Sequence, residues 1–126
     1  MSALPSRLIG TGVLFIFIFL SGVWLSNAGR PLNVLVLTIH KLMGLGTAIL
    51  FGVTVYQINQ QVGLTSTVWI AVAITLMLFL ATIISGGLSS LEQPAAAAIL
   101  AIHKIGPFLT VLSTVASTYL LVKSQA

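Results

Sequence analysis

The sequence contains no cysteine, and a single acidic residue, Glu92, in 126 positions. Without cysteine there is no disulfide framework, no thiolate metal site, no iron–sulfur cluster and no haem attached through a C-x-x-C-H motif. Charged residues make up only 5% of the chain, whereas about a quarter is usual in a soluble domain. Hydrophobic residues make up 58%. This composition excludes a soluble globular domain and makes the lipid bilayer the expected environment.

Four apolar segments are each long enough to cross a bilayer, which takes about 20 residues in a helix. They are residues 8–26, 32–57, 67–86 and 95–122. The connections between them are short, so consecutive helices should lie antiparallel as neighbours. The sequence therefore predicts an all-α, membrane-spanning, up-down-up-down four-helix bundle that forms a single transmembrane domain.

The few cations are scattered along the chain without a basic run, so we expect no nucleic-acid partner despite the net charge of +4. In the predicted layout, Arg7 and Lys123 lie on the membrane face that carries the termini. On the opposite face Arg30 is offset by Glu92. We expect an integral protein of a bacterial cytoplasmic membrane, and by the positive-inside rule we expect its termini on the cytoplasmic side.

The second half of the chain repeats the first. Residues 31–41 align with residues 94–104, and the two stretches match at a proline, a leucine, an isoleucine, a histidine and a lysine. We interpret residues 8–57 and residues 67–122 as two copies of one helical hairpin. A bundle with two-fold pseudo-symmetry follows from this duplication.

His40 and His103 are the only histidines, and they occupy matching positions in the two copies. Each lies about 13 Å along its helix from the proline that precedes it, if the helix rises about 1.5 Å per residue. The second and fourth helices of such a bundle are parallel, across a diagonal of about 11–14 Å. That gap suits a metalloporphyrin between two axial imidazoles. We therefore expect one haem b per chain, with His40 and His103 as its metal ligands.

Two glycines on the other pair of helices support a flat ligand. Ser21-Gly22 aligns with Ser85-Gly86, so the glycines lie at comparable distances from the same membrane face. Glycine lets a flat ring approach the backbone closely, and we expect Gly22 and Gly86 to border the porphyrin. Glycines in membrane helices also act as packing notches, which is the simpler interpretation of each one alone.

A lysine follows each histidine. Lys41 and Lys104 would each cost about 2.5–3.5 kcal/mol at a helix centre if unpaired. Side chains tilt toward the N-terminal end of a helix, so both ammonium groups should reach toward the membrane face that carries Arg30. Haem propionates pointing to that face would balance these cations. Alternatively, the lysines simply reach the lipid headgroups, and the histidines hydrogen-bond neighbouring helices.

The histidine-bearing second and fourth helices, the glycine-bearing partner helices and the duplication resemble membrane b-type cytochromes with a four-helix core. The resemblance is architectural and covers most of the chain. The family includes transmembrane ferrireductases and the cytochrome subunits of hydrogenases and formate dehydrogenases, where electrons pass to or from quinones. Many members hold two haems with four histidines, whereas this chain has one pair. The resemblance implies a one-haem electron carrier or redox subunit rather than a stand-alone enzyme.

Two other functions stay open. A non-catalytic accessory subunit of a respiratory or photosynthetic complex, binding haem or another pigment through its histidines, fits a small membrane bundle. A proton-coupled transporter fits less well, because such mechanisms need a titrating carboxylate within the membrane. The one acidic residue, Glu92, falls in a predicted connection.

Overall fold

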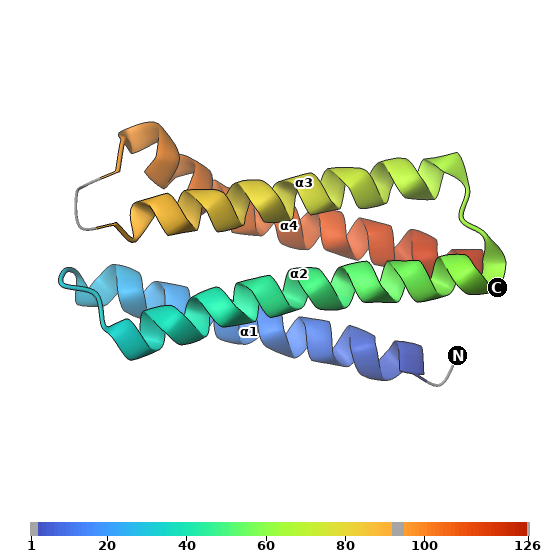
Figure 1. Ribbon diagram of the computed structural model, residues 1–126, viewed down its shortest axis with the longest axis horizontal. Coiled ribbons are helices and arrows are strands. Elements are labelled where there is room, and N and C mark those ends of the chain that lie inside the picture. Colours follow the sequence, from blue (N-terminus) through green and yellow to red (C-terminus); the bar gives the residue numbers. More distant parts are fainter. Residues whose placement is uncertain (1–2, 92–94, 126) are drawn as a thin grey trace. The chain divides into compact units, whose positions relative to one another are not determined.

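The computed structural model describes residues 3–91 and 95–125, and the side chains from Pro5 onward. Four helices account for nearly all of these residues, and their regular secondary structure is entirely helical (Figure 1). The helices are α1 (Ala3–Ala28), α2 (Val34–Val62), α3 (Ser66–Ser89) and α4 (Ala97–Ser124). The all-α fold predicted from the sequence is confirmed.

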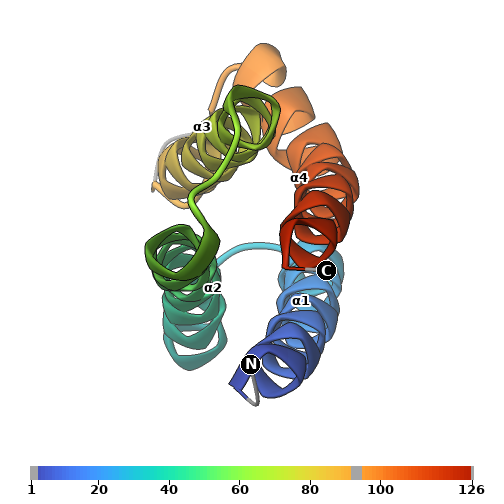
Figure 2. The same ribbon diagram turned by 90° about the vertical axis from the view of Figure 1, so that its right-hand side faces the viewer.

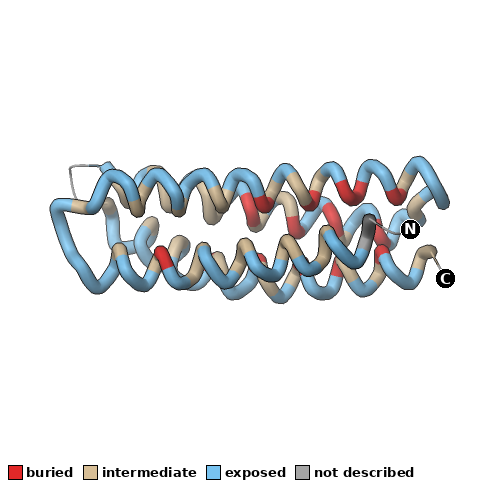
Figure 3. The backbone as a smooth tube through the Cα atoms, turned by 90° about the horizontal axis from the view of Figure 1, so that it is seen from below, coloured by how far each residue is buried: buried red, intermediate tan, exposed pale blue. Residues whose placement is uncertain are grey.

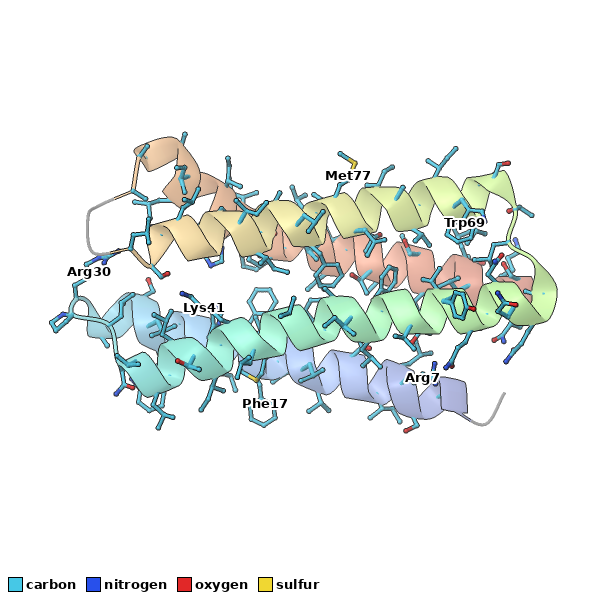
Figure 4. The ribbon with its side chains drawn as sticks, viewed as in Figure 1. Arg7, Phe17, Arg30, Lys41, Trp69 and Met77 are labelled. Carbon is cyan, nitrogen blue, oxygen red and sulfur yellow. The ribbon has the colours of Figure 1, made fainter. Side chains whose placement is uncertain are left out.

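Each helix is long enough and apolar enough to cross a membrane. Large apolar side chains are exposed along them; Phe17 of α1 and Met77 of α3, for example, are 53% and 70% exposed (Figure 4). In water such a surface would drive association, whereas lipid tails cover it without penalty. A helix also satisfies its own backbone hydrogen bonds, as a membrane-spanning segment must. The chain thus has the construction of an integral membrane protein.

Capping residues, rather than the ends of the apolar runs, determine where α2 begins and ends. It begins at Val34 because the Asn33 side chain accepts a hydrogen bond from the Val36 amide at 3.1 Å. It ends before Gly63, whose φ of 65° suits glycine and whose amide donates to the Asn59 carbonyl oxygen at 2.9 Å. The helix runs past the end of the apolar segment because backbone hydrogen bonds, not apolar side chains, propagate it.

The connection between α2 and α3 is consequently only residues 63–65, shorter than the apolar pattern predicts. Thr65 caps α3, and its side-chain oxygen accepts from the Val68 amide at 3.5 Å. The other two connections are residues 29–33 and 90–96. Glu92 belongs to the last of these and lies outside the described residues.

The chain divides into two compact units, residues 1–51 and residues 52–126, with the boundary inside α2. In the first unit, α1 and the first part of α2 lie antiparallel (Figure 1). In the second, α3 and α4 lie along each other, as Figure 2 shows, together with the end of α2. There the Gln125 amide donates to Gln61 Oε1 at 3.1 Å. Each unit therefore has helix packing of its own.

Hydroxyl side chains line the contact between α3 and α4 in the second unit, where several positions are buried (red in Figure 3). Thr75 Oγ1 lies 2.8 Å from Ser117 Oγ and also bonds Ser113 Oγ. Nearer the other end, Thr82 Oγ1 lies 3.2 Å from Thr110 Oγ1. Lipid provides no hydrophobic force between helices, so such hydrogen bonds and close contacts hold them together.

Candidate functional site

The first histidine site lies in the first unit. His40, on α2, is half-buried, and its Nδ1 lies 2.8 Å from Ser21 Oγ of α1. The Ser21 hydroxyl donates its hydrogen to the Ile18 carbonyl oxygen at 3.0 Å. A hydroxyl group has only one hydrogen, so Ser21 Oγ presents a lone pair to the ring, and Nδ1 is the donor. Two consecutive hydrogen bonds thus fix the imidazole to α1.

The second site lies in the second unit and contains the same residue types. His103, on α4, is half-buried, and its Nδ1 lies 3.0 Å from the Thr82 carbonyl oxygen of α3. Ser85 Oγ is 3.4 Å from the same nitrogen and donates to the same carbonyl at 3.0 Å. A carbonyl oxygen can only accept, so Nδ1 of His103 carries the proton.

Gly22 and Gly86 lie against the two imidazoles. A Cβ atom added at Gly22 would lie 3.2 Å from Cε1 of His40, and one added at Gly86 would lie 2.6 Å from Cε1 of His103. Real Cβ atoms essentially never make contacts under 3.0 Å. The flat ring nearest each glycine is therefore the imidazole of its own hairpin, where the sequence led us to expect a porphyrin edge. Glycine lets each histidine pack onto the preceding helix.

The two histidines sit at equal depth along their helices. Each is the seventh residue of its helix, counting from Val34 in α2 and from Ala97 in α4. At about 1.5 Å per residue, both imidazoles are attached about 9 Å from the helix start. The equal spacing seen in the sequence thus carries over to helical positions.

The hydrogen bonds at Nδ1 determine which ring nitrogen is suited to a metal. A neutral imidazole with its proton on Nδ1 has a lone pair on Nε2. Metal-binding histidines characteristically donate one ring N–H to a carbonyl or another acceptor and bind the metal through the other nitrogen. His40 and His103 both have this arrangement. Their Nε2 atoms are the nitrogen donors that the chain offers.

The predicted cationic residues are all at the surface. Lys41 and Lys104 are exposed, and each is turned about 100° around its helix from the adjacent histidine. Arg30 is exposed in the connection between α1 and α2, and Figure 4 labels both Arg30 and Lys41. The one acidic residue of the sequence, Glu92, is outside the described residues. The lysines are accessible to an anion from outside the chain.

Ser21 and Ser85 had no role in the sequence-based interpretation, although both directly precede the paired glycines. The repetition of this Ser-Gly pair in both hairpins is the feature of the sequence that points to the two serines. The Thr82 carbonyl gave no signal, because every residue supplies a backbone carbonyl. The structure adds two acceptors, Ser21 Oγ at His40 and the Thr82 carbonyl at His103, with Ser85 beside the second.

Comparison with protein-family models, curated proteins and solved structures finds no match to this chain. The two histidine sites and the residues around them are therefore the features from which a function can be proposed.

Proposed function

We propose that the protein is a membrane b-type cytochrome that binds one haem b per chain, with His40 and His103 as axial ligands, and acts in electron transfer. The matched pair of histidine sites carries this proposal. In each site Nδ1 donates to an acceptor on the preceding helix, and Nε2 keeps the lone pair that iron binds. A histidine kept only for helix packing has no need of the same tautomer in both hairpins.

The donor set fits haem better than a bare metal ion. A porphyrin brings four nitrogen ligands, so two imidazoles complete six-coordinate iron. A structural zinc ion takes four protein ligands, yet the chain has no cysteine and one acidic residue. With both histidines holding the iron, a bound haem would have no position left for oxygen chemistry, which favours electron transfer. When bound, haem supplies a one-electron redox couple.

The exposed cations fit the anionic edge of a haem. We assign Lys41 and Lys104, with Arg30, to the two propionates, since all three are exposed cations. Charge-assisted hydrogen bonds of this kind are stronger than neutral ones. Gly22 and Gly86 contribute to the site indirectly, by giving each imidazole room against the preceding helix.

The decisive experiment is an absorption spectrum of the detergent-purified protein, air-oxidised and then reduced with dithionite, after expression with ample haem. We expect a sharp Soret shift and narrow α and β bands on reduction. His40→Ala and His103→Ala should each abolish this pigment. Ile39→Ala and Ile102→Ala, at exposed positions one residue earlier, are the matched controls and should retain it.

A pigment retained at the wild-type level in both single histidine variants would defeat the ligand assignment. A second measurement separates ligation from packing. Imidazole added to His40→Gly or His103→Gly protein should restore the low-spin spectrum, because it can occupy the vacated ligand position. A histidine with a purely structural role would show no such recovery.

We further propose a bacterial cytoplasmic membrane as the location, with cytoplasmic termini and a quinone or a neighbouring redox subunit as the electron partner. Arg7 and Lys123 support this orientation. Because the chain has no cysteine, a single introduced thiol reports its own side of the membrane. Ser26→Cys should react with an impermeant maleimide on intact spheroplasts, and Ser124→Cys should not. The reverse labelling would invert the topology.

A further inference from the structure

The two histidine sites differ in the atom that accepts the Nδ1 hydrogen bond. At His40 it is a side-chain oxygen, Ser21 Oγ, at 2.8 Å. At His103 it is the backbone oxygen of Thr82 at 3.0 Å, while Ser85 Oγ is more distant at 3.4 Å. Hydrogen bonds from a ring N–H to oxygen are usually about 2.7–3.2 Å long. The contacts with Ser21 and with the Thr82 carbonyl fall within this range, and the contact with Ser85 does not.

The difference arises within an arrangement that both hairpins share, a serine and the backbone carbonyl three residues before it. In both hairpins the serine donates its hydroxyl hydrogen to the carbonyl three residues earlier, Ser21 to Ile18 and Ser85 to Thr82, at 3.0 Å in each case. In the first hairpin the imidazole of His40 bonds the serine, Ser21. In the second hairpin the imidazole of His103 bonds the carbonyl of Thr82. Ser21 and Ser85 are therefore equivalent in sequence, but Ser21 lies closer to its histidine than Ser85 does.

A hydrogen bond at Nδ1 affects the metal through the other ring nitrogen. Donation from Nδ1–H increases the electron density of the ring and makes Nε2 a more basic ligand. A more basic axial ligand stabilises Fe(III) relative to Fe(II) and lowers the midpoint potential. Loss of the acceptor should therefore raise the potential and let the ring reorient.

We propose that Ser21 is a positioning residue, whose Oγ fixes the tautomer, orientation and basicity of His40, while the backbone at Thr82 does the same for His103. Ser21 is only 9% exposed, so water does not readily substitute for its hydroxyl. The redox consequence rests on the proposed haem site. The tautomer assignment rests on the hydrogen bonds alone.

The first test uses the haem-loaded, full-length protein. Ser21→Ala should raise the midpoint potential and weaken haem binding by about 10- to 100-fold, the usual effect of removing such a partner. Ser85→Ala should change both quantities less, because the Thr82 carbonyl still accepts from His103. Ser21→Thr keeps a hydroxyl and should return both quantities toward wild type. Ser26→Ala, at an exposed position of α1, should leave them unchanged.

Equal shifts for Ser21→Ala and Ser85→Ala, or no shift for Ser21→Ala, would overturn the proposal. Loss of helix packing alone would lower stability without moving the potential of the haem that stays bound. The potential is therefore the informative measurement, and the thermal stability of each variant is its control.

The second test needs no haem. Nitrogen-15 NMR of the histidine-labelled apoprotein, at a pH where both rings are neutral, distinguishes the two tautomers. We expect Nδ1–H for both rings, assigned with His40→Ala, and a shift of His40 alone toward Nε2–H in Ser21→Ala. An Nε2–H tautomer of His40 in the wild type would overturn the proposal.

The two tests separate the proposals. Nδ1–H tautomers in a protein that binds no haem would overturn the cytochrome function and the redox role of Ser21, and would support the tautomer assignment. Haem binding with an insensitive Ser21 would support the function and overturn the inference.

Discussion

In both hairpins a serine and a glycine lie against the histidine, but the imidazole packs closer to the glycine in the second hairpin than in the first. A Cβ at Gly22 would be 3.2 Å from the nearest imidazole atom, whereas one at Gly86 would be 2.6 Å away. The tighter hairpin is the one in which the imidazole reaches a backbone carbonyl. In the looser hairpin it bonds the serine. The acceptor of the Nδ1 hydrogen bond thus differs together with the distance between the imidazole and the preceding helix.

The residues one turn beyond the histidines differ in size between the two hairpins. Gly106 of α4 is buried, and a Cβ there would lie 2.6 Å from Thr82 Oγ1 of α3. In the first hairpin the matching position is Met43, a large residue. A small residue such as glycine lets two membrane helices approach closely. Pro107 follows Gly106 in α4, and the helix continues through it.

The largest expected effect is at the two paired glycines. Overpacking costs about 1–3 kcal/mol, and Gly86→Ala should fall at the upper end because three atoms of the His103 ring lie within 3.3 Å of the added Cβ. Gly22→Ala needs a movement of only a few tenths of an ångström, and the helix propensity of alanine offsets it by about 0.8–1.0 kcal/mol. Unfolding free energies in mixed micelles and the pigment content measure both changes. Equal losses would show that the two sites are equally tight.

Gly106→Ala should separate α4 from α3 beside His103 and destabilise the second hairpin by about 1–2 kcal/mol, since the added methyl meets Thr82 Oγ1. A second substitution, Thr82→Ala, removes that atom and should recover most of the loss. The separation should also make His103 depend on Ser85. Ser85→Ala is then expected to raise the midpoint potential more in the Gly106→Ala background than alone. Additive effects of Gly106→Ala and Ser85→Ala on the midpoint potential would contradict a link between the approach of α3 to α4 and the acceptor that His103 uses.

The exposed lysines allow a test of the equivalence of the two hairpins. Lys41→Gln and Lys104→Gln should each weaken haem retention by up to about fivefold, because exposed ion pairs contribute about 0.2–1 kcal/mol. The double variant should combine both losses. Retention is measured by transfer of haem to apomyoglobin, and added salt should weaken retention in the wild type more than in the double variant. A loss confined to one lysine would assign both propionates to one hairpin.

The smallest effect is expected at the hydroxyl contacts of α3 and α4. Thr75→Val keeps the shape of the side chain but removes the bonds to Ser113 and Ser117, and should cost about 0.6 kcal/mol, the average for such bonds between membrane helices. Thr38→Val is the control, because the Thr38 hydroxyl is exposed and donates to the Val34 carbonyl of its own helix. Equal unfolding free energies for Thr75→Val and Thr38→Val would show that the hydroxyl bonds between α3 and α4 do not stabilise this interface.

The sequence predicts the fold well because its main determinants are local. Apolar length identifies four helices, and the spacing of His40 and His103 from matching prolines predicts their equal helical positions. The helix ends are less predictable, since caps such as Asn33 and Gly63 act through backbone geometry. The partners of the imidazoles are less predictable still. One of them is a backbone carbonyl, and the pairing depends on an approach of helices that no periodicity encodes.

The Thr82 carbonyl has a consequence for how such a protein can change over generations. An acceptor on the backbone survives almost any substitution at its own position, so the hydrogen bond at His103 is shielded from mutation as long as α3 stays helical. The matching bond at His40 depends on one serine codon. A single base change at position 21 can therefore remove the acceptor of His40, whereas the acceptor of His103 is retained, and in the proposed haem site only one of the two ligands would be altered.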